Sequence, residues 1–540
     1  MKVTNYLIKN GVKVLLFYLF TFLPLHAQDS LLLRNFQFVK QHDAWLTSSN
    51  GAGLSHFQRP SISTAELSLQ YATGGLTPFG GASNVVQATA DVESFYRISP
   101  RTVLHGSIGY DNWTGRSMTG SVFMGEHLPF DIVEQTADNT GRKHRDTYRL
   151  QGAVGVDLWR GYSVGALINY RAANYAKYKD LRHSNKLMQL QLSVGATAPL
   201  TPWLTVGANY LYHRQTESVN YQTYGKIDRI YLSLIDYAAF MGFSEQYGTA
   251  GFTDNSREMP LVEDRNGASV QIDVRPLRDL SFHNELTYTH GKGYYGRKSP
   301  YTIVYTNHQR DVFSYQGRVV LQRPHTHHLL DLSAAVEKLD NNRENYRERQ
   351  NEAGSTYYEY YSDVQTAKKR WYDFSALYTL HLGIRGEQPL WTLSAGYHWQ
   401  QRQQTAYLYP YYRHQQLTTH TLTASILRNV LTRRGVWTAS LQGSYQKGSG
   451  APYTDGTYAT PSEKQAPPAT MNTFLYQDYH LLTSPQFSLA AEGKYAFRIP
   501  HTQLLTHVRL NVEYRRATQL AADDCGRQWT AITLAAGCTF

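Results

Sequence analysis

The chain has 540 residues, of which 41% are hydrophobic, and its formal net charge is +11 at pH 7. With a mean hydropathy of −0.47, it is too polar for a bundle of membrane helices, each of which needs about 20 apolar residues. Large membrane β-barrels have this balance, because their strands alternate lipid-facing apolar and lumen-facing polar residues. The 42 Tyr and nine Trp fit such a barrel, because aromatic side chains with a polar tip gather at membrane interfaces.

The first 27 residues predict a cleaved signal peptide. An apolar run at residues 14–25 follows three lysines and leads to Ala27, a small residue at a cleavage position before Gln28. About a dozen apolar residues are too few to span a bilayer as a helix, which makes a membrane anchor the less favoured alternative. We therefore expect an exported protein.

Residues 28–62 lack the alternation that follows them. They are too few for a folded plug domain, which argues against a TonB-dependent receptor. We predict that this segment either lies in the lumen of a barrel as a partial plug, which we favour, or hangs in the periplasm.

From residue 63 to residue 540 the sequence repeats alternating segments, joined by short connections on one side and longer polar stretches on the other. In the clearest case, Val508 and Leu510 share a face opposite Arg509 and Glu513. A barrel turns the apolar face toward lipid and the charges toward its lumen. Strands are expected at residues 63–72, 85–96, 102–112, 146–158, 162–174, 186–198, 203–217, 268–276, 279–290, 312–322, 328–339, 369–382, 390–402, 416–428, 436–447, 485–498, 501–515 and 529–540.

These segments predict an all-β protein, a transmembrane antiparallel β-barrel of about 18 strands. Sixteen strands is the alternative, because residues 268–276 alternate weakly. An even number of strands puts both termini on the periplasmic side, with eight short periplasmic turns and nine long extracellular loops.

The residue pattern of the last expected strand, 529–540, indicates a barrel-assembly signal. Five residues fall on its apolar face: Ile532, Leu534, Ala536, Cys538 and the terminal Phe540. The expected partner is the barrel-assembly machinery. Cys525 lies at the far end of this strand, roughly 40 Å from Cys538 at about 3.3 Å per residue, whereas a disulfide needs Cα atoms within about 7 Å. The two cysteines are therefore not expected to pair with each other.

The predicted lumen carries charges of both signs, which suits ion pairs across strands. The lumen-facing candidates are Arg149, Arg171, Asp273, Glu285, Arg318, Asp373, Arg402, Glu492, Lys494, Arg509, Glu513 and Arg515. An excess of positive charge favours anionic solutes or the phosphates of lipopolysaccharide, because fields of one sign steer ions. The count mixes lumen, loops and turns, so this preference is open.

Residues 218–267 form the longest outward loop. Its apolar residues recur every three or four positions, at Ile227, Ile230, Tyr231, Leu234, Ile235, Ala238 and Met241. This spacing predicts a helix with one apolar stripe. The helix is expected either to narrow or cover the lumen, or to pack on neighbouring loops.

Two other residue types gather in predicted connections. Tyrosines crowd residues 294–305, 357–361, 407–412 and 453–479, where they either contact planar ligands such as sugars or belong to the outer aromatic girdle and to strands that continue above it. His325, His327 and His328 lie in a predicted periplasmic turn. No carboxylate or Cys adjoins them to complete a metal site, so a solvated turn is expected.

No pattern for catalysis or for nucleic-acid binding stands out. No Gly-x-Ser-x-Gly motif surrounds a plausible nucleophile, and no segment reads as a phosphate-binding loop. We expect no enzyme activity, no cofactor, no metal and no nucleic-acid partner. A hydrolase at the barrel rim is the third and least favoured hypothesis.

Residues 44–54, Ala-Trp-Leu-Thr-Ser-Ser-Asn-Gly-Ala-Gly-Leu, resemble the N-terminal motif of barrels related to the long-chain fatty-acid transporters. Taken with the signal peptide, the barrel length and Phe540, the whole chain more nearly resembles uncharacterised outer-membrane barrels of Bacteroidota that are associated with nutrient uptake. This resemblance implies the outer membrane of a Gram-negative bacterium, with lipid and lipopolysaccharide around the barrel and a TonB-dependent receptor or a surface lipoprotein as partner. It supplies no ligand residues.

The sequence therefore predicts a channel or transporter for polar solutes whose lumen charges tune selectivity. The alternative is a plugged barrel that serves as a component of an uptake complex. Alternation does not separate these two hypotheses, because open and filled lumens use the same pattern.

Overall fold

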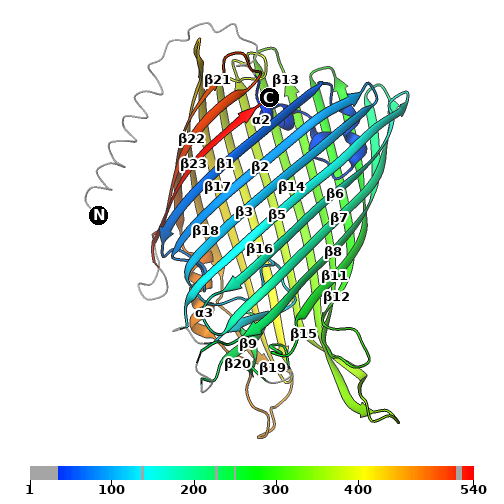
Figure 1. Cartoon of the computed structure of the whole chain (residues 1–540), viewed down its shortest axis with the longest axis vertical. Helices are drawn as coiled ribbons and strands as arrows, with labels where there is room; N and C mark the ends of the chain where they lie inside the picture. Colours follow the sequence, from blue (N-terminus) through cyan, green and yellow to red (C-terminus); the bar gives the residue numbers. More distant parts are fainter. Residues whose placement is uncertain (1–33, 136–138, 226–228, 249–250, 519–525) are drawn as a thin grey trace, which may run out of the picture.

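The computed structural model describes residues 34–135, 139–225, 229–248, 251–518 and 526–540. The predicted signal peptide, the first residues of the predicted segment 28–62 and Cys525 lie outside these ranges. Within them, eighteen antiparallel strands form a barrel (Figure 1). They are β1 (Ser61–Gly74), β2 (Asn84–Ser99), β3 (Thr102–Met118), β5 (Gly141–Trp159), β6 (Tyr162–Lys177), β7 (Arg182–Thr201), β8 (Leu204–Gln222), β11 (Met259–Leu277), β12 (Leu280–Gly296), β13 (Val304–Gln322), β14 (Thr326–Gln350), β15 (Thr356–Leu382), β16 (Trp391–Leu408), β17 (Tyr411–Leu431), β18 (Gly435–Gly450), β21 (Gln486–Arg498), β22 (Leu505–Ala517) and β23 (Gln528–Thr539).

The barrel is closed by the pairing of its first and last strands. β1 and β23 run antiparallel, with Leu67 opposite Ala536. Ser63 of β1 and the terminal residue Phe540 also exchange backbone hydrogen bonds of 2.8 and 3.0 Å. The prediction of eighteen strands is confirmed, and the sixteen-strand alternative is wrong.

The outer face of the barrel is apolar and exposed. Leu69, Ile108, Val194 and Leu534 each expose more than half of their surface. Burial of such a band in lipid is favourable, and closure leaves the sheet without an open edge of unpaired backbone groups. The protein is therefore a β-barrel of the outer membrane of a Gram-negative bacterium.

Among the described helices, none is both long and apolar enough to cross a membrane.

The start of the first barrel strand, β1, and the end of the last, β23, lie at the same end of the barrel, which we call the terminal end (Figure 1). Connections there are short, as predicted, and Gly161 with φ 83° forms the tight turn between β5 and β6. The opposite end, the loop end, has longer connections, but the prediction of nine long loops is wrong. Only Tyr409 and Pro410 separate β16 from β17.

Several strands continue past the predicted boundaries at the loop end. β14 and β15 are much longer than the predicted segments 328–339 and 369–382. Their hairpin projects beyond the rest of the barrel (Figure 1). Alternation disappears in this part because both faces of a strand above the membrane meet water.

Two groups of smaller elements supplement the barrel. Near the terminal end lie α2 (Phe36–His42) and the 3₁₀ helices η2 (Ala44–Thr47) and η3 (Gly51–His56). Near the loop end lie α3 (Asn472–Thr483), the strand β19 (Thr454–Thr457), which pairs with β17, and a small sheet. The strands of that sheet are β4 (Asp131–Glu134), β9 (Leu232–Ala238), β10 (Met241–Gln246) and β20 (Ala469–Thr470).

The predicted helix within residues 218–267 is wrong, because β9 and β10 form an antiparallel hairpin there. Leu234 and Ile235 are neighbours in sequence, and both are fully buried. Both faces of β9 therefore meet other parts of the protein. A strand buried on both faces loses the period of two, and the remaining apolar pattern resembles a helical stripe.

Candidate functional site

The segment 34–60, which we call the N-terminal plug, packs against the inner wall of the barrel through an apolar cluster, in which Phe36 and Phe57 meet Phe95 of β2, and through polar contacts. The indole Nε1 of Trp45, which is 2% exposed, donates to Asp273 at 3.1 Å. The side chain of Asn50 donates to the carbonyls of Ala196 and Ala208 and to Gln271, at 3.0 to 3.3 Å. A buried amide that uses its donors in this way fixes the segment to strands β7, β8 and β11.

Glycines let the N-terminal plug touch the wall. A Cβ at Gly165 of β6 would lie 2.2 Å from the backbone nitrogen of Ala52, and a Cβ at Gly51 would lie 2.5 Å from the carbonyl oxygen of Ala166. Such distances leave no room for a side chain, so backbone meets backbone at this point. The segment that resembles the fatty-acid transporter motif is thus the part of the plug in closest contact with the barrel.

The N-terminal plug does not cover the whole cross-section. Beside α2 a cavity of about 360 Å³ remains, and the wall residues that line it lie mainly on β16, β17, β18, β21 and β22. A solute therefore has space on the side of the barrel opposite η3, which contacts β5, β6 and β7.

Three imidazoles meet at the end of α2. Nδ1 of His327 lies 2.8 Å from Nε2 of His42, and the ring of His381 is 5.4 Å from that of His42. Burial lowers the pKa of His42 from 6.5 to about 3, so this imidazole is neutral at physiological pH. The prediction that His327 belongs to a solvated turn is wrong, because it contacts the N-terminal plug. No cluster of His, Cys, Asp and Glu able to hold a metal is present among the described residues.

At the loop end, residues 119–135, 229–248 and 251–258 form the second obstruction, which we call the loop-end plug. Its centre is aromatic: the ring of Phe130, which is fully buried, meets Phe123, Phe252 and Tyr295 edge to face at 5.1 to 5.8 Å. Tyr295 belongs to the barrel wall, so the plug and the wall share one apolar core. The tyrosines at 294–305 thus lie partly in this core.

Cations of the wall hold the backbone of the loop-end plug. Lys369 of β15 donates to the carbonyl of Leu128 at 2.9 Å, and Arg413 of β17 donates to the carbonyl of Ala239 at 3.3 Å. On the other side of the lumen, Lys177 of β6 forms a buried ion pair with Glu134. The plug is therefore fastened to strands on opposite sides and crosses the lumen.

A chamber lies between the two plugs. On β7, Ser193 donates to the carbonyl of Ser49 in the N-terminal plug at 2.8 Å, whereas Asn185 donates to the carbonyl of Val122 in the loop-end plug at 3.0 Å. The strand positions between these contacts face a cavity of about 570 Å³. β6 and β8 likewise contact the N-terminal plug at one position and the loop-end plug further along the strand.

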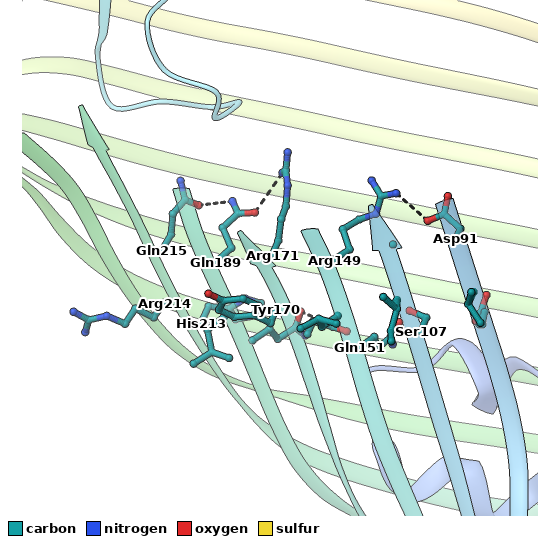
Figure 2. Close-up of a pocket in the computed structure, with 18 of the residues that line it drawn as sticks. Asp91, Ser107, Arg149, Gln151, Tyr170, Arg171, Gln189, His213, Arg214 and Gln215 are labelled. Carbon is teal, nitrogen blue, oxygen red and sulfur yellow. Dashed lines mark hydrogen bonds and ion pairs between the residues drawn. The ribbon is translucent and has the colours of Figure 1, made fainter. Parts of the chain in front are cut away.

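The wall of the chamber is polar. Its inward-facing side chains include Asp91, Glu93, Ser107, Arg149, Gln151, Asn169, Arg171, Gln189, Gln191, His213, Gln215 and Arg265. Figure 2 shows Asp91, Arg149, Arg171, Gln189 and Gln215 projecting to the same side of the strands. Such a cavity offers hydrogen bonds and charge to a solute.

Two of the predicted lumen residues, Arg149 and Arg171, line the chamber. Three others, Asp273, Glu285 and Arg318, bond to the N-terminal plug: Asp273 accepts from Trp45, Glu285 accepts from Ser49, and Arg318 donates to the carbonyl of Gln41. In these places the lumen charges hold a segment of the chain.

The remaining predicted lumen residues are spread around the wall. Arg402 borders a small cavity of about 170 Å³ under the loop-end plug, together with Asp131 and Asp236. Glu492 and Lys494 line the cavity beside α2. Arg509 pairs with Glu492 and with Glu66 of β1, and Asp373 with His398. Glu513 pairs with Arg515 of the same strand.

The amides of the chamber were not predicted from the sequence, because only charged residues were considered as lumen-facing candidates. Asn169, Gln189, Gln191 and Gln215 alternate with lipid-facing residues such as Ile168 and Leu192. The same parity that identified Arg149 and Arg171 would have found them.

The face proposed as the assembly signal lies on the outer surface, where Ile532, Leu534 and Phe540 are 46%, 54% and 40% exposed. Cys538 on the same strand is a free thiol.

Comparison with known proteins gives the following relations. No curated protein matches the chain. Among solved structures, the ferric preacinetobactin receptor BauA of Acinetobacter baumannii is similar at 8% identity and a TM-score of 0.42, over 88% of this chain and 80% of the receptor. The alcaligin outer-membrane receptor FauA of Bordetella pertussis is similar at 10% identity and a TM-score of 0.37, over 89% and 77% of the two chains. The RagAB peptide importer is similar at 8% identity and a TM-score of 0.39, over 90% and 87%.

A family model covers the whole barrel and the last ten residues of the N-terminal plug. It is described as a family of unknown function, DUF6850, and it matches residues 51–540. The chain therefore belongs to the family DUF6850.

Proposed function

We propose that this protein is an outer-membrane channel for the uptake of polar solutes. The observation that carries the proposal is the polar chamber of about 570 Å³ between the two plugs. A barrel that served only as a scaffold would gain stability from filling this space with packed side chains. A cavity lined with amides and charges instead offers solutes the contacts that they lose with water.

In this proposal the two plugs have different roles in solute passage. The loop-end plug crosses the lumen and forms the constriction. The N-terminal plug leaves the cavity of about 360 Å³ beside α2, which provides the exit toward the terminal end. Predicted lumen residues at that exit, Glu492 and Lys494, tune selectivity by charge.

The experiment that tests this proposal is solute flux into liposomes that contain the purified, folded protein. We compare the wild type with a variant in which residues 232–246, the β9–β10 hairpin, are replaced by a short Gly-Ser linker. The matched control lacks residues 346–360, a stretch of equal length in the projecting β14–β15 hairpin. Folding of each variant is checked by heat-modifiable migration.

We expect small polar sugars to enter faster through the variant without residues 232–246 than through the wild type or the control. Flux that is absent from all three folded proteins would overturn the proposal, because a permanently blocked lumen carries no solute.

A second candidate function rests on the projecting β14–β15 hairpin. Its strands carry exposed aromatic and charged side chains, among them Tyr361, whose ring lies 4.8 Å from the guanidinium of Arg347. An aromatic arm outside the membrane suits contact with a partner in an uptake complex, such as a surface lipoprotein or a TonB-dependent receptor. Gentle extraction would then yield a stoichiometric complex that the deletion of residues 346–360 abolishes.

Two further partners remain proposals. The apolar face that ends in Phe540 is proposed as the signal for the barrel-assembly machinery. Lipid and lipopolysaccharide are proposed to surround the exposed apolar band.

A further inference from the structure

Two arginines face each other in the wall of the chamber. Arg149 of β5 and Arg171 of β6 are directly opposite in the register of the two strands, and both line the cavity. Like charges in this position repel each other unless counter-charges neutralise them. An arginine that lacks a carboxylate partner in the protein is therefore available to bind an anionic group of a ligand.

Only one of the two arginines has a carboxylate partner. Arg149 pairs with Asp91 at 2.9 Å, as Figure 2 shows. The nearby Asp111 pairs with Arg145 at 3.7 Å. Arg171 instead donates to the side-chain oxygen of Gln189 at 3.4 Å, and no described carboxylate lies within ion-pair distance of it. The guanidinium of Arg171 thus keeps most of its donors for a ligand.

Amides extend from Arg171 along the wall. Gln189 donates to Gln215 at 2.9 Å, so that Arg171, Gln189 and Gln215 form a chain of hydrogen bonds (Figure 2). At the next inward-facing position toward the N-terminal plug, two residues along each strand, Asn169 donates to Gln191 at 3.3 Å. Each of these amides has further donors and acceptors that face the cavity. Hydroxyl or amide groups of a solute match such a surface.

We propose that the chamber binds anionic polar solutes, with a carboxylate, sulfate or phosphate group on Arg171 and a body rich in hydroxyl or amide groups along Gln189 and Gln215. This inference rests on the proposed function and names its substrate class. Guanidinium groups bind such planar or tetrahedral anions through paired, charge-assisted hydrogen bonds. A cavity of about 570 Å³ accommodates a solute of the size of a small acidic saccharide.

The experiment measures equilibrium binding to the detergent-solubilised, full-length protein by calorimetry. The probes are glucuronate, glucose as its neutral counterpart, and inorganic sulfate and phosphate. We expect glucuronate to bind and glucose to bind at least tenfold more weakly, because the carboxylate makes the contact with Arg171. R171Q is expected to weaken glucuronate binding by roughly tenfold to a hundredfold, the range for a lost charge-assisted hydrogen bond.

The matched control is R214Q. Arg214 neighbours His213 on β8 but points away from the chamber in Figure 2, and it pairs with Asp264 at 3.1 Å. This variant loses the same charge and should bind glucuronate like the wild type. A second variant, Q215L, separates the two parts of the ligand: it should weaken glucuronate binding and leave sulfate and phosphate binding unchanged if the solute is an acidic saccharide. Equal losses for all anions would assign the site to free inorganic anions.

The inference is overturned if the wild type binds none of the anions, or if R171Q and R214Q weaken binding equally. Failure of the inference is distinguishable from failure of the proposed function. Solute flux without binding at Arg171 would refute only the assigned substrate class, whereas binding without flux through any variant would refute the channel.

Discussion

The two plugs fill the same lumen by different means. The N-terminal plug combines polar contacts, such as those of Trp45 with Asp273 and of Asn50 with Gln271, with a cluster of only eight buried apolar residues that it shares with the wall. The loop-end plug has an aromatic centre around Phe130 that merges with the wall at Tyr295. The first lies along one side of the barrel and leaves a cavity beside it, and the second is fastened to opposite sides.

The difference matters because water replaces polar and apolar contacts unequally. Hydrogen bonds to water offset most of what a released polar segment loses, so each such bond has a net value of only about 1 kcal/mol. Exposure of an aromatic core has no such compensation. The apolar core that the loop-end plug shares with the wall contains 18 buried residues, whereas the cluster of the N-terminal plug contains eight. The loop-end plug is therefore the firmer obstacle, and the predictions that follow weaken each plug in turn.

The largest effect is expected from Phe130→Ala. Truncation of this fully buried ring should destabilise the closed loop-end plug by about 3–5 kcal/mol. Hydrogen exchange of residues 119–135 would measure the loss. Phe313→Ala is the control, because that ring faces outward and is 50% exposed. Unchanged protection of residues 119–135 in Phe130→Ala would show that the aromatic centre does not hold the plug.

The next effect depends on pH. Burial raises the pKa of Asp131 in the loop-end plug from 3.8 to about 6, although Ser121, Ile132, Lys369 and Lys143 oppose the rise. A carboxyl whose pKa is raised in the closed state favours closure when it is protonated. Closure is thus most stable below about pH 4 and loses this contribution as the pH rises through about 6, by up to roughly tenfold per pKa unit.

Single-channel recordings between pH 4 and pH 7 test this expectation. Openings of the wild type should become more frequent as the pH rises through this window, and Asp131→Asn should flatten the dependence. Asp236 lies in the same plug, and its pKa is also raised by burial, so Asp131→Asn/Asp236→Asn should flatten the profile further. A wild type that opens more often in acid would contradict the assigned direction.

A smaller effect is expected in the N-terminal plug. Asn50→Ala removes the donors that satisfy the carbonyls of Ala196 and Ala208, which should cost about 1–3 kcal/mol. Protection of residues 44–54 against hydrogen exchange should fall accordingly. Gln58→Ala, at an exposed position whose amide donates to the carbonyl of its near neighbour His56, should have no effect. A loss as large as that of Phe130→Ala would remove the difference between the plugs.

The sequence predicted the barrel well because its strands obey one simple rule. Wherever one face meets lipid and the other meets polar lumen, as for Val508 and Arg509 in β22, parity assigns each side chain. The β9–β10 hairpin was not predicted as strands, because Leu234 and Ile235 are both buried and no alternation remains. The contact of His327 with the N-terminal plug was not predicted either, because its partner His42 is distant in the sequence.

The candidate site was predicted only in part. Parity placed Arg149 and Arg171 on the inner face, but which lumen charges meet a plug and which meet a cavity depends on where two remote segments fold. Nothing near Asp273 in the sequence indicates that it accepts a hydrogen bond from Trp45. Periodicity reports the face on which a side chain lies and carries no information on its partners across the lumen.

The most direct test of this account is the single-channel conductance of two deletions in planar bilayers. One variant lacks residues 34–60, the N-terminal plug, and the other lacks residues 232–246 of the loop-end plug. We predict a clearly larger conductance step for the variant without residues 232–246, because that hairpin is part of the plug that crosses the lumen. An equal or larger step after removal of residues 34–60 would contradict the account, since the constriction would then lie at the terminal end.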